Sequence, residues 1–537
     1  MGGGTFNATT YLLDSHIDAG LGNAVAVRSR DCSLTYAELL DCVAHAAGGL
    51  RDLGVRPEER VLIVLLDGPD WLAAFLGTLR IGAVPVPVST MLTSRDLIGI
   101  AQDARPRVAI VSDELASLPG FLAGTGWLDH IVVAGPPGTA AQAREHPRGR
   151  QIHRWQDFMQ AAPAAAAATT TETPGFWLYT SGTTSFPHAA MHRQVDLRTT
   201  AEAFGSQVLG VRSDDIAYSV SKLFFAFGLG NSLTFPLSAG ATAVLDRRPP
   251  TPTSVAEVIQ KERPTLFFAV PSFYASLLAA EVPKDSFASV RAAVSAGESL
   301  PAEIFHRFRK RFGVEIIDGL GSTEALHTYL SNRPGQARAG TCGTPVPGYE
   351  VRIVNGEGRP VAPGKPGHLL LRGDSIATGY WADAAASRRV FEGEWLRTGD
   401  VCSCSPEGVF THLGRANDML KAGGIWVSPT EVEAALLQHP SLLEASVVGQ
   451  PDHEGIERLV AYLVARPGQV PAEHELGAFV RERLAAFKRP RRFVLLPELP
   501  KTTTGKIRRT ELRSYPWPGE QRADAVTCAS ASADQAV

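Results

Sequence analysis

A short run of hydroxylated and glycine residues is the first part of this sequence to which chemistry can be assigned. Every residue from Thr180 to Ser185 is Thr, Ser or Gly, and the run overlaps the end of the apolar segment FWLYT. Backbone N–H groups and hydroxyls in such a loop can surround a polyphosphate, and Gly182 allows close approach of the chain. The loop lacks the Gly-Lys-Ser/Thr of a Walker A motif. Taken alone, it is equally consistent with an ordinary Ser/Thr-rich turn.

Four more polar, glycine-bearing motifs follow in order. They are DGLGSTEALH (318–327), RTGDV (397–401), GRANDMLKAGG (414–424) and LPKTTTGKIRR (499–509). Together with the first loop they resemble the adenylate-forming superfamily of acyl-CoA synthetases, luciferases and peptide-synthetase adenylation domains, over nearly the whole chain. Three longer segments are similar to its benzoate-CoA ligase branch: FNATTYLLD (6–14), KLFFAFGLGNSLTFPLSAGATAVL (222–245) and STEALHTYLSN (322–332).

The resemblance implies a reaction in two steps. A carboxylate attacks the α-phosphorus of ATP to give an acyl-adenylate and pyrophosphate, and a thiol then displaces AMP. The first step brings two anions together, so it needs cationic and hydrogen-bonding groups around the transition state. The implied cofactors are ATP, Mg²⁺ and coenzyme A, or a carrier-protein phosphopantetheine in place of coenzyme A.

The resemblance also assigns nucleotide contacts to individual residues. The phosphate loop comprises Thr180, Ser181, Gly182, Thr183 and Thr184. Thr323 would bond the α-phosphate and Glu324 would hold Mg²⁺, although an acid after Ser322 is also a common helix-capping arrangement. The adenine side comprises Ser295, Ala296, Gly297, Glu298, Asp318 and Gly319. Asp400, otherwise a plain turn acid, would bind the ribose hydroxyls with help from Arg415.

Lys506 is the expected catalytic cation, because the resemblance lets it reach both the carboxylate and the α-phosphate. The chain has only nine lysines, and none precedes Lys222. The alternative is a solvated lysine in a basic stretch. A lysine acetyltransferase is a further candidate partner, since PKTTTGK resembles the family's acetylation target. For the thiol step the resemblance implies a hinge at Asp418 and a loop at the pantetheine arm formed by Lys421, Gly423 and Gly424.

Two positions of the phosphate loop depart from the family pattern. Where the family usually continues Gly-x-Pro-Lys, this chain has Ser185-Phe186-Pro187-His188. Serine has less backbone freedom than glycine, and histidine is only partly charged near neutrality. We expect weaker ATP affinity or an altered pH dependence, and not loss of activity.

An aromatic and glycine-rich segment is the candidate acid pocket. It contains Phe225, Ala226, Phe227 and Gly228, and an aromatic wall beside glycines suits a flat ring. His327 should face the same cleft, and in the resembling branch this histidine lies near the substrate carboxylate. The alternatives are core packing of the phenylalanines and a satisfied buried histidine. We expect benzoate or a simple substituted benzoate.

Around these motifs the pattern of apolar runs predicts an α/β fold. Buried strands are expected at 60–66, 107–112, 130–135, 241–246, 265–271 and 290–298, and an amphipathic helix at 34–54. We expect an N-terminal adenylation domain at 1–417 with mainly parallel sheets, including a small β subdomain at about 340–417. A mobile α+β domain is expected at 418–518, and a disordered tail at 519–537. The low-complexity stretch 160–175 is interpreted as a surface connector.

Composition excludes several classes of protein. The 537 residues carry 52 Lys+Arg against 55 Asp+Glu, a net charge of −3, which argues against general nucleic-acid binding. No apolar run approaches 18 residues and the first residues lack a signal peptide, so we expect no membrane partner. Six cysteines without metal spacing indicate reduced thiols and a cytoplasmic setting.

Three functions stay open at this stage. The first is an aryl-acid:CoA ligase acting on a small aryl acid. The second is a stand-alone adenylating enzyme that loads an acyl carrier protein, a partner with the same thiol chemistry. The third is a non-catalytic nucleotide-binding regulator, which would release no pyrophosphate with any aryl acid.

Overall fold

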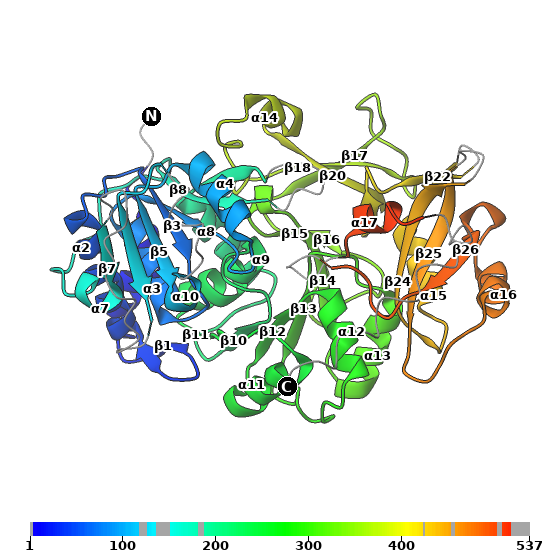
Figure 1. Cartoon of the computed structure of the whole chain (residues 1–537), viewed down its shortest axis with the longest axis horizontal. Coiled ribbons are helices and arrows are strands. Elements are labelled where there is room, and N and C mark those ends of the chain that lie inside the picture. Colours follow the sequence, from blue (N-terminus) through cyan, green and yellow to red (C-terminus); the bar gives the residue numbers. More distant parts are fainter. Residues whose placement is uncertain are drawn as a thin grey trace, which may run out of the picture. The chain divides into compact units, whose positions relative to one another are not determined.

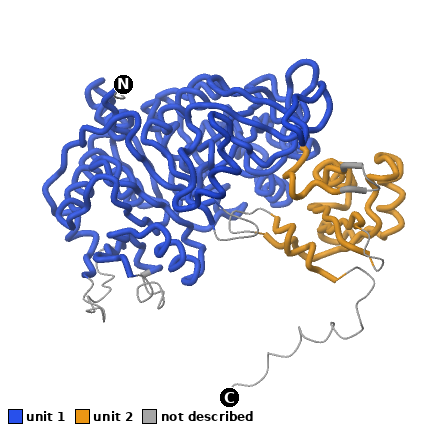
Figure 2. Tube along the Cα trace, turned by 90° about the horizontal axis from the view of Figure 1, so that it is seen from above, with its two compact units in different colours: residues 1–412 blue, residues 413–537 orange. Residues whose placement is uncertain are grey.

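The computed structural model describes residues 4–116, 126–135, 151–180, 187–422, 425–452, 457–501 and 507–516. The chain forms two compact units, residues 1–412 and 413–537, which Figure 2 colours separately. The boundary falls within strand β21 (Phe410–Arg415), a few residues before the hinge that the sequence suggests at Asp418. Each unit is described by itself below.

A parallel five-stranded sheet begins the larger unit. Its order is β4 (Val84–Pro87), β3 (Arg60–Val64), β5 (Val108–Ser112), β6 (His130–Ala134) and β7 (Gln151–Arg154). The associated helices are α2 (Tyr36–Asp52), α3 (Pro69–Arg80), α4 (Ser94–Ala104), α5 (Asp113–Ala116) and α7 (Trp155–Phe158). Continuous apolar strands joined by helices are typical of buried parallel sheets. Helix α2 begins at a capping box, in which Thr35 and Glu38 bond each other's backbone N–H groups.

The second sheet has nine strands and carries most of the predicted site residues. Its order is β16 (Thr344–Pro345), β15 (Thr328–Ser331), β14 (Ile316–Gly321), β13 (Ala292–Ser295), β12 (Leu266–Ala269), β10 (Ile216–Ser219), β11 (Thr242–Val244), β1 (Val25–Arg28) and β2 (Ser33–Thr35). The central strands are parallel, whereas β2, β15 and β16 run antiparallel to their neighbours. The prediction of mainly parallel sheets is therefore confirmed for the middle of this sheet, and its edges are mixed.

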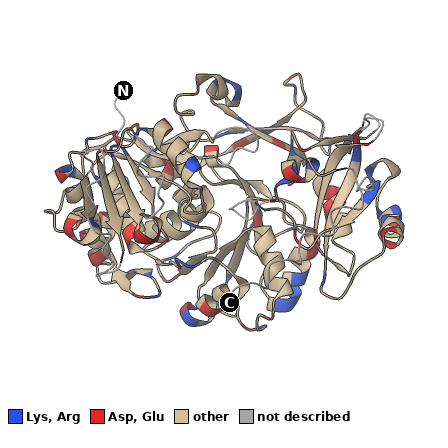
Figure 3. Cartoon of the chain, viewed as in Figure 1, with Lys and Arg blue, Asp and Glu red and all other residues tan. Residues whose placement is uncertain are grey.

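Helices cover the second sheet. Three of them are α11 (Pro252–Glu262), α12 (Pro271–Ala279) and α13 (Ala302–Phe312) (Figure 1). They contribute Ile259, Tyr274 and Phe308 to the buried apolar cluster that includes Phe267 of β12. Helix α13 carries Arg309, Lys310 and Arg311 in its last turn. Lys and Arg positions are blue on the ribbon in Figure 3. Cations suit the negative end of the helix dipole.

Other helical segments of this unit depart from regular α geometry. The short helices are α1 (Ser15–Asp18), α8 (Val195–Thr200), α9 (Ala226–Leu229) and α10 (Phe235–Ser238). Wider π-helical turns precede α1 at Thr10–Asp14, follow α8 at Ala201–Ser206 and join α9 to α10 at Gly230–Thr234. Such turns often occur at functional sites, because they redirect side chains that a regular helix would hold elsewhere.

Smaller sheets complete the larger unit. Strands β8 (Pro174–Tyr179) and β9 (Ala189–Arg193) form an antiparallel hairpin. A further sheet contains β17 (Glu350–Val354), β18 (Gly367–Arg372), β19 (Phe391–Glu392), β20 (Trp395–Cys404) and β21, with helix α14 (Ala384–Val390) between β18 and β19. These strands lie within the stretch for which the sequence predicts a β subdomain.

The smaller unit is an α+β structure. Its strands are β22 (Leu420–Ala422), β23 (Ile425–Val427), β24 (Leu442–Pro451), β25 (Glu457–Ala465) and β26 (Arg492–Leu495). Its helices are α15 (Pro429–Leu436), α16 (Glu473–Arg483) and α17 (Arg509–Arg513). Strands β24 and β25 are antiparallel, and β25 and β26 are parallel.

The alanine-rich stretch after residue 160 is more than a surface connector. The Ala164 and Ala167 N–H groups donate to the carbonyls of Ala44 and Arg80, at 2.9 and 2.8 Å. A Cβ on Gly48 of α2 would lie 1.9 Å from the Ala162 carbonyl oxygen. The small side chains therefore allow this stretch to pack its main chain directly on α2 and α3.

Candidate active site

The β8–β9 hairpin closes the base of the predicted phosphate loop. Thr180 donates its N–H to the carbonyl of His188 at 2.9 Å. The remaining predicted loop residues, Ser181, Gly182, Thr183 and Thr184, lie outside the described residues, as does Ser185. Their phosphate contacts stay a prediction.

His188, which stands where the family usually has lysine, is linked to the candidate magnesium ligand. Its Nδ1 lies 3.2 Å from Asp383 Oδ2, and its ring lies 5.0 Å from that of Tyr380. The Tyr380 hydroxyl donates to Glu324 Oε1 at 2.7 Å. No sequence motif pointed to Tyr380 or Asp383, because both are far from Glu324 along the chain.

Thr323 and Glu324 lie on a 3₁₀ turn (Thr323–Ala325) that follows β14. Ser322 caps this turn, accepting from the Ala325 N–H at 3.3 Å. Leu326 ends the turn at φ 69°, a left-handed conformation that is unfavourable for a branched side chain. Such a turn persists only when the surrounding residues hold it in place. The carboxylate oxygens of Glu324 on this turn are of the type that Mg²⁺ prefers as ligands.

On the predicted adenine side, Ser295, the last residue of β13, lies opposite Asp318 of β14, where the parallel pairing of the two strands ends. Ligands of open α/β sheets bind at this edge. Asp318 is buried, burial raises its pKa to about 8, and its Oδ1 has no hydrogen-bond partner in the described part of the chain. Gly319 must lack a side chain, since a Cβ would lie 2.8 Å from the Leu330 carbonyl oxygen.

The other predicted adenine residues follow β13. Ala296 is buried, and Gly297 has φ 91°, a conformation that favours glycine. Glu298 accepts from the Ser272 N–H at 3.3 Å.

Asp400, the predicted ribose ligand, is almost fully buried and already oriented. Tyr329 donates its hydroxyl to one carboxylate oxygen at 3.3 Å, and His412 Nε2 lies 3.2 Å from the other. The Ser299 hydroxyl bonds the second ring nitrogen of His412 at 2.7 Å. The carboxylate is thereby tied to the segment that follows the predicted adenine residues.

The candidate acid pocket is built around His327. Its ring packs against Phe204, Phe227 and Phe235, with centroids 5.4, 5.4 and 4.6 Å away. Burial lowers the pKa of His327 to about 3, so the ring is neutral at pH 7. Its Nε2 bonds the Asn231 Oδ1 at 3.2 Å, and its Nδ1 has no partner among the residues described. His327 can therefore offer hydrogen bonds but not a permanent charge.

The wall beside His327 is tightly packed. Phe225 precedes α9, and Ala226 and Phe227 are half-buried on it. A Cβ on Gly228 would lie 2.0 Å from the Lys222 carbonyl oxygen, so only glycine fits there. Two of the contacts of His327, from Phe204 and Asn231, come from the π-helical turns, which the sequence pattern did not reveal.

Three predicted residues of the smaller unit lie within the described part of the chain. Asp418 accepts from Arg513 Nη2 of α17 at 2.7 Å. Arg415 is exposed on β21, and Lys421 lies on β22. Gly423, Gly424 and the catalytic candidate Lys506 lie outside the described residues. Their roles therefore stay predictions.

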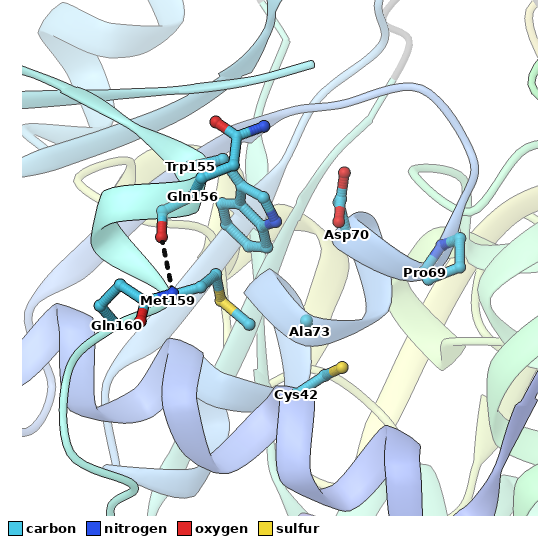
Figure 4. A pocket seen from close by; sticks show the side chains of 8 residues that line it. All are labelled: Cys42, Pro69, Asp70, Ala73, Trp155, Gln156, Met159 and Gln160. Atoms are coloured by element: carbon cyan, nitrogen blue, oxygen red, sulfur yellow. Dashed lines mark hydrogen bonds between the residues drawn. The ribbon is translucent and has the colours of Figure 1, made fainter. Parts of the chain in front are cut away.

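A separate cavity of about 310 Å³ lies among α2, α3 and α7 (Figure 4). Its lining includes Cys42, Trp155 and Met159, and none of the predicted site residues. Within the residues described, no three His, Cys, Asp or Glu side chains cluster as a metal site, and no helix is both long and apolar enough to cross a membrane.

The layered sheets and the Thr323–Glu324 turn define an adenylate-forming enzyme, and the chain belongs to the AMP-binding enzyme family. The model of that family matches residues 16–381, and that of the AMP-binding enzyme C-terminal domain matches residues 431–506. The chain is 42% identical over 516 residues to a benzoate–CoA ligase of Thauera aromatica, covering 95% of this chain and 96% of the relative. The predicted superfamily and fold class are confirmed.

Two solved structures are also similar. One is a benzoate CoA ligase from Burkholderia xenovorans LB400, with 40% identity, a TM-score of 0.86 and coverage of 95% of this chain and 100% of the other. The second is the anthranilate CoA ligase AuaEII in complex with anthranoyl-AMP, with 36% identity, a TM-score of 0.89 and coverage of 95% and 97%. Both are ligases of aromatic acids.

Proposed function

We propose that this protein activates benzoate or a simple substituted benzoate with ATP and transfers the acyl group to coenzyme A. The observation that supports this most directly is the aromatic enclosure of His327 by Phe204, Phe227 and Phe235. Flat rings stack well against such walls, and the pocket offers no fixed charge for an amino-acid substrate. The named ligases above act on acids of the same class.

The proposed chemistry gives each predicted polar group one role. The acid's carboxylate oxygen forms a bond to the α-phosphorus, and the bond to the pyrophosphate oxygen breaks. Thr323 holds the α-phosphate, and Lys506 offsets the repulsion between the two anions. The thiol sulfur of coenzyme A then bonds the acyl carbon, its proton is lost, and AMP leaves with the former carboxylate oxygen.

Glu324 fits the proposed role of magnesium ligand. Its Oε1 accepts from Tyr380, and its Oε2 has no partner among the residues described, which leaves an oxygen for a hard cation. When bound, Mg²⁺ neutralises charge on the phosphate oxygens. The contribution of this chain is to hold the carboxylate in one orientation, through Tyr380 and the fixed backbone of the turn.

A panel of acids tests the proposal. Pyrophosphate release is measured with benzoate, acetate, octanoate and phenylalanine, with coenzyme A present and absent. We expect kcat/KM for benzoate to exceed the others by at least tenfold. A better rate with octanoate would contradict the aromatic pocket. Thioester yield with coenzyme A against a holo carrier protein identifies the acceptor, and a lack of pyrophosphate release with every aryl acid would favour a nucleotide-binding regulator.

A further inference from the structure

His192, at the end of β9, contacts hydrogen-bond acceptors through both of its ring nitrogens. Its Nδ1 lies 3.2 Å from Asp196 Oδ2, and its Nε2 lies 2.8 Å from the carbonyl oxygen of Thr323. The side chains of His192 and Asp196 are fully buried. The second contact joins residues 131 positions apart and reaches the turn that carries Glu324.

Asp196 is held as a carboxylate. Arg193 donates from Nε and Nη2 to Oδ1 at 3.1 and 3.0 Å, and its backbone N–H donates to Oδ2 at 3.0 Å. A guanidinium is always protonated and donates only, and an ionised carboxylate accepts only. The proton between Asp196 and His192 therefore belongs to the imidazole Nδ1.

The Thr323 carbonyl cannot donate either, so Nε2 must also carry a proton. His192 is then an imidazolium, and its charge together with those of Arg193 and Asp196 sums to +1. Other ionisable side chains beside this cluster are Glu172, which lies 3.5 Å from Arg193, and Tyr349. The ring plane is fixed by stacking on Phe176, with centroids 5.2 Å apart and an angle of 17° between the rings.

We propose that His192, protonated on both nitrogens, is a positioning residue for adenylation that fixes the turn bearing Thr323 and Glu324. This inference rests on the proposed function of that turn. Three successive carbonyls of the turn accept from outside it: Thr323 from His192, Glu324 from the Ala377 N–H at 2.8 Å, and Ala325 from the Ser375 hydroxyl at 2.7 Å.

Among these three donors only His192 is charged, and charge-assisted hydrogen bonds are the stronger ones. It acts on Thr323, the residue proposed to bond the α-phosphate. The left-handed Leu326 at the end of the turn makes such external support necessary, because the turn would otherwise relax. His192 touches neither ATP nor acid in this proposal.

Two amide substitutions separate the contacts of His192. In His192→Gln the amide nitrogen can reach the place of Nε2 and still donate to Thr323. In His192→Asn it reaches only the place of Nδ1, so the bond to Asp196 is kept and the bond to Thr323 is lost. Both variants are neutral amides at the same buried position, which makes each the control for the other.

We expect His192→Asn to lower kcat for benzoate-dependent pyrophosphate release by about 10- to 100-fold, with the benzoate KM changed less than twofold. His192→Gln should lower kcat less than fivefold. Calorimetric affinity for Mg²⁺-ATP without acid should fall in the Asn variant and be retained in the Gln variant. Equal kcat and equal affinity in the two variants would overturn the proposal.

A spectroscopic measurement keeps the inference testable if the variants fold poorly. In wild-type protein labelled with ¹⁵N-histidine, the His192 ring should show two protonated nitrogens at pH 7.5. One unprotonated nitrogen would overturn the imidazolium assignment. If the wild type releases no pyrophosphate with any aryl acid, the proposed function fails, while the nitrogen spectrum and the Mg²⁺-ATP affinities still decide the role of His192.

Discussion

The buried Asp318 should make the stability of the larger unit depend on pH in a defined window. Asp318 lies within β14, and desolvation raises its pKa from 3.8 to about 8. Replacing it with Asn keeps the shape of the side chain but removes the ionisation. The comparison of wild type with Asp318→Asn therefore isolates what it costs to ionise this carboxyl group in the folded protein.

The sign follows from proton linkage. A raised pKa means that the folded state binds the proton more tightly than the unfolded state, so Asp318 destabilises the fold increasingly above pH 4. The resulting loss in the free energy of unfolding grows by about 1.4 kcal/mol per pH unit, and it levels off above the pKa of the folded state near 8. The free energy of unfolding of Asp318→Asn, measured relative to that of wild type, should therefore increase by about 2 kcal/mol between pH 6 and pH 8. Between pH 8 and pH 9 this difference should increase by only about a few tenths of a kcal/mol.

Urea unfolding followed by tryptophan fluorescence measures this difference, because six of the eight tryptophans lie in the larger unit. The matched control is Asp67→Asn, since Asp67 is also buried but its pKa is raised only to about 6. The advantage of the control variant over wild type should change by only a few tenths of a kcal/mol between pH 6 and pH 8. An Asp318→Asn advantage that stays constant from pH 6 to pH 9 would refute the reasoning.

Three further predictions concern catalysis. Ser185→Gly with His188→Lys should lower the ATP KM about fivefold in initial-rate assays, because a permanent cation would then face the phosphates and could still pair with Asp383; an unchanged KM would contradict this. Lys506→Gln, which mimics acetylation, should lower pyrophosphate release at least 100-fold, and full activity would rule out the proposed role. Asp418→Pro should keep pyrophosphate release within about threefold but slow thioester formation from supplied acyl-adenylate at least tenfold, since it removes the Asp418 N–H bond to the Arg415 carbonyl and restricts the hinge. Asp418→Ala is its control and should retain both half-reactions, whereas Lys506→Ala should lose only the first; equal loss of both in the Pro and Lys506→Ala variants would contradict a rotating domain.

Much of the fold could be predicted because the buried strands are continuous apolar runs. The expected strand at 107–112 is β5 (Val108–Ser112), and the expected helix at 34–54 is α2 (Tyr36–Asp52). Both follow from local pattern and capping. The antiparallel edges of the nine-stranded sheet did not follow, because strand direction depends on connections and not on composition.

The candidate site could be predicted only where its residues share a motif. Thr323 and Glu324 are adjacent in sequence, and their resemblance to a known turn identified them. The contacts that fix them, from His192 and Tyr380, cross more than 50 positions of sequence and leave no local signal. Phe204 and Asn231 were missed for a second reason, since π-helical turns shift them away from the face that a regular helix would predict.

The direct packing of the alanine-rich stretch on α2 limits where this chain can be recombined with its relatives. Any side chain at position 48 would push away the main chain of Ala162, so the glycine and the stretch must match each other. A crossover between these two segments would combine an α2 helix from one parent with an alanine-rich stretch from another, and the two would not have evolved to pack together. This holds even though both segments lie outside the catalytic motifs. Chimeras that inherit residues 36–170 from one parent preserve this fit.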